Sequence, residues 1–235
     1  MTLRVHRYGD SVTLCHGVAD RLAATIAAKQ ADGSVMTLCL SDGLAGICAW
    51  FGSGFDAGTI DPSRLDLWWS DERFVDITDP TRVSTQTLAA FGASWRFDPA
   101  NVHPMPTASG NPDIDKAALQ HAAELGDRQF DLAILAVGED GAVAGLAPDS
   151  PAFVAPPPHT VTSVADDHLT LTLSALARSR EVWLVACGSE HAAAVAGALA
   201  GDQKLPAGAL RGQENTCLFV DDAAAALLPW HTCEL

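Results

Sequence analysis

The chain of 235 residues is 48% hydrophobic and 18% charged, a balance that favours a compact globule over a disordered or fibrous protein. Its 14 Lys and Arg against 29 Asp and Glu give a formal net charge of -15, which disfavours nucleic acid and anionic membrane as partners. A phosphorylated ligand would need a local cluster of cations or backbone N–H groups in this field. The length is ordinary for one α/β unit, so we expect a single domain over residues 1–235.

The cysteines and the first residues indicate a reducing compartment. No Cys-x-x-Cys pair and no zinc-type spacing of Cys and His occurs, so we expect reduced, mostly buried thiols and no metal site. The six cysteines are Cys15, Cys39, Cys48, Cys187, Cys217 and Cys233. Because the first ten residues lack the apolar core of a signal peptide and no apolar stretch reaches membrane length, the cytoplasm is the expected location.

The N-terminal part of the chain predicts a helix, a strand and a second helix. Apolar residues recur at intervals of three and four from Val12 to Ile26, after the candidate caps Asp10 and Ser11. An apolar run over 35–40 predicts a strand, and the turn 41–43 leads into a helix over 44–51.

The same strand, turn and helix unit recurs along the rest of the chain. Strands are predicted over 65–69, 131–137, 182–187 and 216–220, with helices opening near Ser84 and His191 and a last one after Asp222. Proline-rich stretches at 104–112 and 156–158 are predicted as long loops. Continuous apolar strands alternating with helices predict a doubly wound, mostly parallel sheet with helices on both faces, a Rossmann-like α/β fold.

Three polar segments come directly after predicted strands: 41–43, 71–73 and 138–141. In parallel α/β sheets the ligand crevice lies beyond the carboxyl ends of the strands, where helix N-termini point inward. We therefore expect these segments to share one rim of the sheet.

The turn Gly138-Glu139-Asp140-Gly141 has two interpretations of equal weight. Its glycines allow close approach of the backbone to a ligand while a carboxylate acts as a base, or the segment is a tight turn with solvated acids.

A structural role is the favoured interpretation for two other polar segments and for two histidines when each is taken alone. Arg73 could bind a phosphate next to the acids Asp71 and Glu72, but a surface ion-pair cluster is the favoured interpretation. Asp42 places a negative charge where a phosphate would bind a helix N-terminus, so a helix-cap role is favoured. His168 and His191 are each more often solvated or structural. The chain has no nucleophile elbow, P-loop or Rossmann glycine fingerprint.

Taken in order, several segments resemble the 6-phosphogluconolactonase family, which is related to glucosamine-6-phosphate deaminases. They span about nine tenths of the chain and are 40–43, 68–75, 130–141, 150–151, 169–173 and 205–221. The resemblance implies a glucosamine-6-phosphate deaminase-like fold. It also implies hydrolysis of 6-phosphogluconolactone to 6-phosphogluconate, a step of the pentose phosphate pathway, with no metal and no organic cofactor.

The resemblance also identifies a missing catalytic group. In the family a histidine that activates water follows the Gly-x-Asp-Gly turn, and this position is Ala142. The acids that remain as catalytic candidates are Asp140, Glu139 and Asp71.

The phosphate contacts of the family are also replaced. Its Ser-Gly-Gly-Ser-Thr-Pro loop corresponds to residues 41–46, Ser-Asp-Gly-Leu-Ala-Gly, its arginine before the Thr-Leu-Thr strand to His168, and its lysine to His191. Arg73 is retained and Arg211 is a second candidate cation. The candidate substrate-binding residues are therefore Ser41, Gly43, Arg73, Gly138, Gly141, His168, His191 and Arg211.

Three functions follow from the resemblance. The first is a lactonase-type hydrolase of sugar lactones, impaired or retuned to a less charged substrate, with Asp140 and His168 in substitute roles. The alternative is a non-catalytic member that binds a sugar phosphate, a partner protein or a second copy of itself. A sugar-phosphate isomerase or deaminase is less favoured because the phosphate-binding groups are missing.

Overall fold

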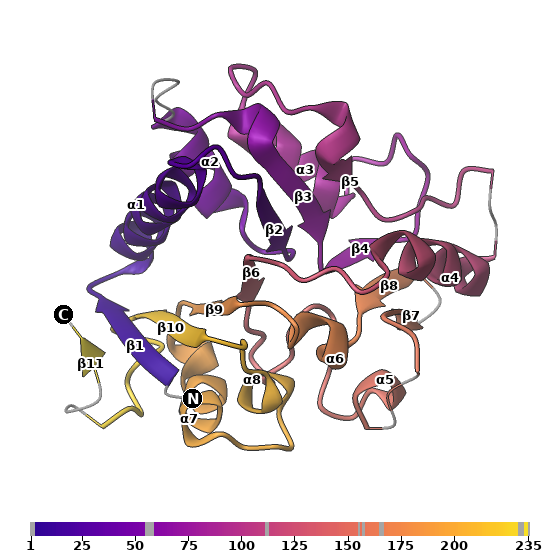
Figure 1. Ribbon diagram of the computed structural model, residues 1–235. Helices are drawn as coiled ribbons and strands as arrows, with labels where there is room; N and C mark the ends of the chain where they lie inside the picture. The colour runs from indigo at the N-terminus through magenta and orange to yellow at the C-terminus, as the bar shows by residue number, and fades with distance from the viewer. Residues whose placement is uncertain are drawn as a thin grey trace.

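The larger of two sheets has the predicted doubly wound architecture (Figure 1). The computed structural model describes residues 3–54, 59–110, 113–154, 156, 158–164, 167–229 and 233–234. The strands of this sheet are β1 (Leu3–Tyr8), β2 (Met36–Leu40), β3 (Leu65–Trp69), β5 (Val102–His103), β6 (Leu132–Ala136), β9 (Glu181–Ala186), β10 (Asn215–Asp221) and β11 (Cys233–Glu234). They pair in the order β11-β1-β10-β9-β6-β2-β3-β5, and every described pair is parallel. The predicted fold class is confirmed.

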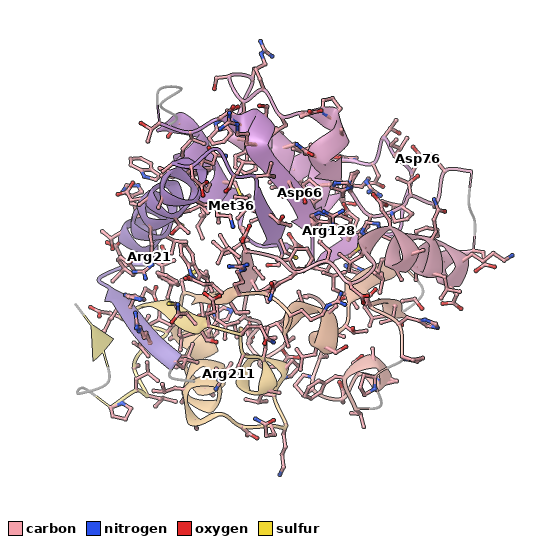
Figure 2. All side chains as sticks on the ribbon, viewed as in Figure 1. Arg21, Met36, Asp66, Asp76, Arg128 and Arg211 are labelled. Atoms are coloured by element: carbon pink, nitrogen blue, oxygen red, sulfur yellow. The ribbon has the colours of Figure 1, made fainter. Side chains whose placement is uncertain are left out.

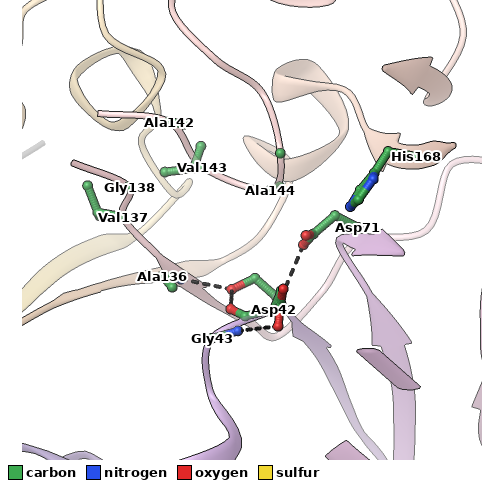
Figure 3. Close-up of a pocket in the computed structure, with 12 residues that line it drawn as sticks. Asp42, Gly43, Asp71, Ala136, Val137, Gly138, Ala142, Val143, Ala144 and His168 are labelled. Atoms are coloured by element: carbon green, nitrogen blue, oxygen red, sulfur yellow. Dashed lines mark hydrogen bonds between the residues drawn. The ribbon is translucent and has the colours of Figure 1, made fainter. Parts of the chain in front are cut away.

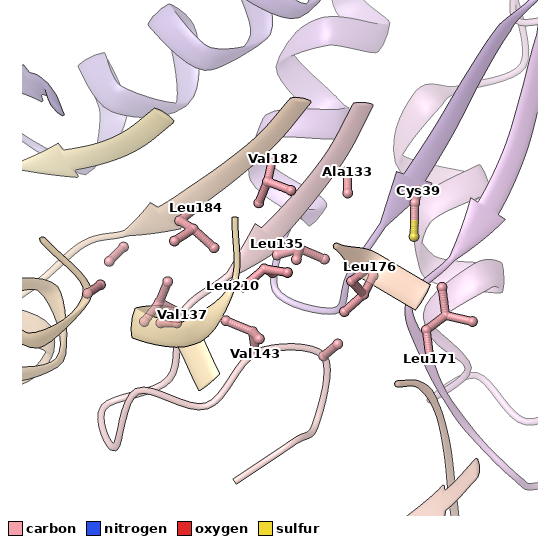
Figure 4. Close-up of a cluster of buried hydrophobic side chains, with 14 of the residues drawn as sticks. Cys39, Ala133, Leu135, Val137, Val143, Leu171, Leu176, Val182, Leu184 and Leu210 are labelled. Atoms are coloured by element: carbon pink, nitrogen blue, oxygen red, sulfur yellow. The ribbon is translucent and has the colours of Figure 1, made fainter. Parts of the chain in front are cut away.

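Helices cover both faces of this sheet, and two separate apolar cores result. The helices are α1 (Ser11–Gln30), α2 (Ala45–Ser53), α3 (Val83–Phe91), α4 (Ile114–Leu125), α5 (Pro151–Val154), α6 (Leu173–Leu176), α7 (Ala192–Ala200) and α8 (Pro206–Ala209). Because successive strand residues point to opposite faces, Leu38 and Leu40 join the core under α1, α2 and α3, whereas Cys39 joins the other core. Figure 4 shows the second core, where Ala133, Leu135 and their neighbours pack together.

The first helix forms where the apolar period and the caps predict it. Asp10 accepts a hydrogen bond from the backbone N–H of Thr13, and the Thr13 hydroxyl accepts one from the Asp10 N–H, which makes a capping box. The face that carries Leu14, Val18 and Leu22 is buried against the sheet.

A smaller antiparallel sheet was not predicted. Its strands are β4 (Asp71–Arg73), β7 (Val161–Val164) and β8 (His168–Leu171), paired in the order β4-β8-β7. Only Ser70 separates β3 from β4: its N–H donates to Leu40 in the large sheet, and its carbonyl accepts from Leu171 in the small one. The chain therefore passes directly from one sheet to the other, and the acidic segment after β3 is buried between them instead of lying on the surface.

Two local predictions were wrong. Asp42 does not cap α2, whose N-cap is Leu44 and has no side-chain hydrogen bond; the Asp42 carboxylate accepts instead from the N–H of Gly43. The expected last helix is also absent, because the residues after β10 form turns. There the carboxylate of Asp221 accepts from the N–H groups of Ala224 and Gly188, which holds the chain in a turn against β9.

The strand β1 was not predicted from the sequence. The predicted strands of the larger sheet, which fall between β2 and β10, lie within one or two residues of their expected positions. β1 is flanked by β10 and β11, and only Val5 of its six residues is buried, so it lacks a continuous apolar run.

A satisfied polar network lies at the amino end of β3, and we call it the Asp66 network. The carboxylate of Asp66 accepts from Trp68 Nε1 at 3.0 Å and from Arg128 at 3.0 Å, and His103 Nε2 lies 3.0 Å away. The other ring nitrogen of His103 lies 2.8 Å from Glu124. Asp66 and Arg128 lie near each other in Figure 2, and the arginine also stacks over the ring of Trp68.

None of the helices described here has the length and apolar character needed to cross a membrane. Among the cysteines whose side chains are described, Cys15, Cys39, Cys48 and Cys187 have free thiols. Cys39, Cys48 and Cys217 are buried, as predicted, whereas Cys187 is exposed and Cys15 is half-buried. The side chain of Cys233 lies outside the described residues.

Candidate active site

A cavity of about 320 Å³ opens at the carboxyl ends of β2 and β6, against β4 and β8 (Figure 3). Its walls are Ser41, Asp42, Gly43, Asp71, Ala136, Val137, Gly138, Ala142, Val143, Ala144, Gly145 and His168. The three segments expected on one rim therefore do meet, each contributing at least one residue to the wall.

Asp71 is the buried acid of this cavity. Its side chain is only 4% exposed; Ser70 Oγ donates to Oδ1 at 2.6 Å and the N–H of Asp42 donates to the same atom at 3.4 Å. Burial is the main reason that the pKa of Asp71 rises to about 6; the Ser70 hydrogen bond opposes this, and the Asp42 carboxylate adds to it. Asp71 can therefore exchange a proton near neutral pH, as acid–base catalysis requires.

His168 stands beside Asp71 at the mouth of the cavity (Figure 3). In the small sheet Asp71 pairs with Thr170 and Arg73 pairs with His168, so Asp71 and His168 share one face at a diagonal spacing. The His168 side chain is 24% exposed, and its Nδ1 lies 3.4 Å from the carboxylate of Asp167. The buried Asp71 and the partly exposed His168 therefore lie together in the cavity wall.

The segment after β2 contributes to the cavity wall more through its backbone than through its side chains. The hydroxyl of Ser41 donates to the carbonyl of Asp42 and accepts from the N–H of Ala136 at 2.8 Å, so it ties β2 to β6. Gly43 has a φ of +80°, and a Cβ there would lie 3.1 Å from the methyl group of Ala136. Ser41 and Gly43 thus line the cavity, and they also shape it.

The turn after β6 divides its residues between the cavity and the solvent. Gly138 and Ala142 line the cavity, and their backbones are joined by a hydrogen bond of 2.9 Å. Asp140 is exposed, and its carboxylate accepts from the N–H of Ala142 at 2.9 Å. Glu139 is also exposed, and Gly141 is buried against Leu205. The structure thus places neither Asp140 nor Glu139 in the cavity wall.

A strained residue in the wall gave no signal in the sequence. Ala144 has a φ of +53°, in the left-handed region that residues other than glycine seldom adopt. Its carbonyl accepts a hydrogen bond from the hydroxyl of the buried Thr170 on β8. Such strain persists only where surrounding contacts enforce it, and it is common at functional sites.

The predicted cations lie outside the cavity wall. Arg73 is exposed on β4, and His191 is the N-cap of α7, 3.7 Å from Glu190. Arg211 donates to the carbonyls of Leu210 and Ala198, so it satisfies the carboxyl end of α7. The titratable side chains in the wall are therefore two carboxylates, Asp42 and Asp71, and one histidine.

Glu72, next to Asp71, is a structural acid. It is fully buried and accepts from the N–H groups of Val83 and Ser84 at the start of α3, and its carboxylate lies 3.4 Å from the buried Arg82. The residues that the structure describes include no group of three or more His, Cys, Asp or Glu placed to hold a metal ion.

The fold and the cavity define an α/β protein with a cavity at the carboxyl ends of parallel strands, the usual position of a ligand site in such sheets, and with a buried acid of raised pKa in its wall. The chain belongs to the family described as glucosamine-6-phosphate isomerases/6-phosphogluconolactonase, whose model matches residues 9–219.

Two relatives match almost the whole chain. The 6-phosphogluconolactonase of Streptomyces coelicolor is 37% identical over 97% of this chain and 94% of its own length. That of Mycobacterium leprae is 32% identical over 97% of this chain and 100% of its own. The resemblance inferred from the motifs is thus confirmed at the level of the family.

Solved structures confirm the fold. The 6-phosphogluconolactonase of Trypanosoma brucei superposes with a TM-score of 0.82 at 19% identity, covering 97% of this chain and 99% of that one. The enzyme of Thermotoga maritima gives 0.80 at 23% identity, covering 94% and 100%. A monomeric glucosamine-6-phosphate deaminase gives 0.73 at 18% identity, covering 96% and 100%, which agrees with the deaminase-like fold expected.

Proposed function

We propose that this chain hydrolyses sugar lactones, as its relatives named 6-phosphogluconolactonase do, and that its cavity is retuned from 6-phosphogluconolactone toward less charged lactones. The observation that carries the proposal is the buried Asp71, with a pKa of about 6, beside His168 in the cavity at the strand ends.

The chemistry needs one base and one acid. The Asp71 carboxylate takes a proton from water as the water oxygen bonds to the lactone carbonyl carbon, and the carbonyl electron pair moves to its oxygen. When that pair returns, the bond between the carbonyl carbon and the ring oxygen breaks. Protonated His168 gives its proton to the ring oxygen, and the product is the open-chain hydroxy acid. Of the acids predicted from the sequence, this assigns the base to Asp71 and leaves Asp140 to hold the turn.

The charge of the cavity explains the retuning. A phosphate would meet Asp42 and Asp71 in the wall, and Arg73, His191 and Arg211 lie outside it. A hydrogen bond to a charged group contributes about 1.5–3 kcal/mol, or about one to two decades of affinity for each cation that is missing. A lactone without phosphate does not incur this loss.

Hydrolysis of gluconolactone and of 6-phosphogluconolactone, each measured against its spontaneous rate, tests the proposal. We expect enzyme-dependent turnover of both, with the higher kcat/KM for the unphosphorylated lactone. Asp71→Asn should remove the turnover, and Asp140→Asn, which keeps a side-chain acceptor in the turn, is the matched control and should retain it. A wild-type protein that leaves both spontaneous rates unchanged contradicts the proposal.

A second candidate is a non-catalytic member that binds a sugar phosphate or a partner protein. The observation that favours it is the methyl group of Ala142 in the cavity wall; the resemblance assigns the family's histidine to this position. This candidate predicts that 6-phosphogluconate binds in a calorimetric titration while neither lactone is turned over.

A further inference from the structure

A second cavity of about 450 Å³ adjoins the first and shares two of its wall residues, Gly145 and His168. The rest of its wall comes from the loop after Ala144, from the start of α5 and from β7: Ala147, Ser150, Pro151 and Val164. The lactone ring and the acid–base pair occupy the first cavity in the proposed function, so the second cavity has no role in it.

The boundary between the two cavities is formed by a residue without a side chain. Gly145 has a φ of +69°, and a Cβ built on it would lie 3.8 Å from Val164 Cγ2. Val164 pairs with His168 across β7 and β8, so the histidine stands between the two spaces. A ligand held at His168 can therefore reach both cavities.

The two cavities differ in chemical character. Asp42 and Asp71 stand in the wall of the first, whereas the described residues in the wall of the second include no Asp, Glu, Lys or Arg, and their only ionisable side chain is the shared His168. Most of its side chains are the carbon groups of Ala147, Pro151 and Val164. Among its described residues, only Ser150 carries a hydroxyl, which accepts from the N–H of Ala152 at 3.3 Å. Away from His168, a wall made mostly of carbon groups favours an apolar group.

Resting on the proposed function, we propose that the second cavity is a subsite for an uncharged alkyl substituent on the lactone ring. The substrate class is then a lactone that carries a hydrophobic chain, with the ring beside Asp71 and the chain passing Gly145 toward Pro151. Each methylene buried there should raise kcat/KM up to about fourfold.

Two lactones with the same six-membered ring test the subsite: δ-hexanolactone, which carries a methyl group, and δ-decalactone, which carries a pentyl chain. We expect kcat/KM to be about 10- to 100-fold higher for δ-decalactone in the wild type. Ala147→Phe and Pro151→Phe fill the second cavity from two sides and should remove this preference, while δ-hexanolactone turnover stays within about threefold.

The control variant is Val154→Phe, because Val154 also belongs to α5 but is 69% exposed and outside the cavity wall. It should keep the wild-type preference. Equal kcat/KM for the two lactones in the wild type, or a preference that survives both cavity-filling variants, overturns the subsite.

Failure of the proposed function can be told apart from failure of the subsite. If neither lactone is hydrolysed above its spontaneous rate, the subsite is tested by calorimetric titration with 3-methylcyclohexanone and 3-pentylcyclohexanone, which hold the ring carbonyl but have no ester bond. The alkyl group is placed as in the lactones by using these 3-substituted ketones, because the ring oxygen of a lactone separates the substituted carbon from the carbonyl. Tighter binding of the pentyl compound that Ala147→Phe abolishes supports the subsite, and equal or absent binding of the two overturns it.

Discussion

An aspartate lies near each end of β3, and the two carboxylates, those of Asp66 and Asp71, have opposite electrostatic surroundings. At the amino end, the carboxylate of Asp66 has Trp68, Arg128 and His103 within 3.0 Å, and all are charged or hydrogen-bonding partners. Beyond the carboxyl end, Oδ1 of Asp71 accepts one hydrogen bond from the Ser70 hydroxyl and a long one from the backbone N–H of Asp42. Its Oδ2 accepts from none of the described residues. A buried acid with its partners in place stabilises the fold, whereas one without them keeps a raised pKa and a free oxygen for chemistry.

Under the proposed function, the acid at the carboxyl side of the strand acts in catalysis, and the acid at the amino end stabilises the fold. Four measurements test this difference between the two acids.

The largest effect is expected on turnover. Asp71→Asn keeps the shape of the side chain and an acceptor for Ser70, but it removes the base, so lactone kcat should fall by about two to four orders of magnitude. Thermal unfolding of the same variant should show no loss of stability, because a neutral amide replaces a buried acid with few partners. A variant that is both active and unstable would give Asp71 a structural role instead.

The Asp66 network should respond in the opposite way. Asp66→Ala removes the acceptor of the buried Trp68 Nε1 and the carboxylate beside the half-buried His103, while Arg128, which is 39% exposed, can be solvated instead. The free energy of unfolding should therefore fall by about 1–3 kcal/mol in denaturant titration. The kcat of the folded fraction should stay at the wild-type value. Lys116→Ala is the control, since it breaks only the exposed pair with Asp113 and should leave the unfolding midpoint unchanged.

The raised pKa of Asp71 also predicts how stability depends on pH. The folded protein holds the Asp71 proton up to about pH 6, whereas the unfolded chain loses it near pH 4, so the group stabilises the fold below pH 4. That contribution, roughly 2–3 kcal/mol, is lost as the pH rises from 4 to 6. Subtracting the Asp71→Asn stability curve from that of the wild type isolates it; a flat difference over this window would show that the pKa is not raised.

The smallest effect is expected from a substitution that adds a basic side chain to the cavity wall. Ala142→His places an imidazole in the cavity wall, and it should raise kcat on 6-phosphogluconolactone about tenfold by adding a second base. Ala49→His, on the exposed face of α2, adds the same side chain away from the site and should leave kcat unchanged. A rate that falls in Ala142→His would mean that the wall cannot hold a larger side chain.

Much of the site was predictable because it depends on chain order. Ser41, Gly43, Gly138 and Ala142 each follow a strand of one parallel sheet, and strands of one direction bring such residues to the same edge. Arg73 and Arg211 are also residues of a type that binds phosphate. In the structure, however, Arg73 is exposed to solvent and Arg211 donates to a carbonyl at the end of α7. Nothing in their local sequence distinguishes a ligand contact from such a structural contact.

The sequence by itself determined the doubly wound sheet, the capping of α1 and the meeting of three segments at one rim. These follow from apolar periodicity, from hydrogen bonds within a few residues and from strand direction. Only the tertiary structure decided which acid is buried. Asp71 and Asp140 both follow a strand, but β4 pairs with β8 about a hundred residues further along and covers Asp71, while Asp140 stays in an exposed turn. Burial of a charge depends on neighbours distant in sequence, and burial sets the pKa that makes Asp71 the candidate base.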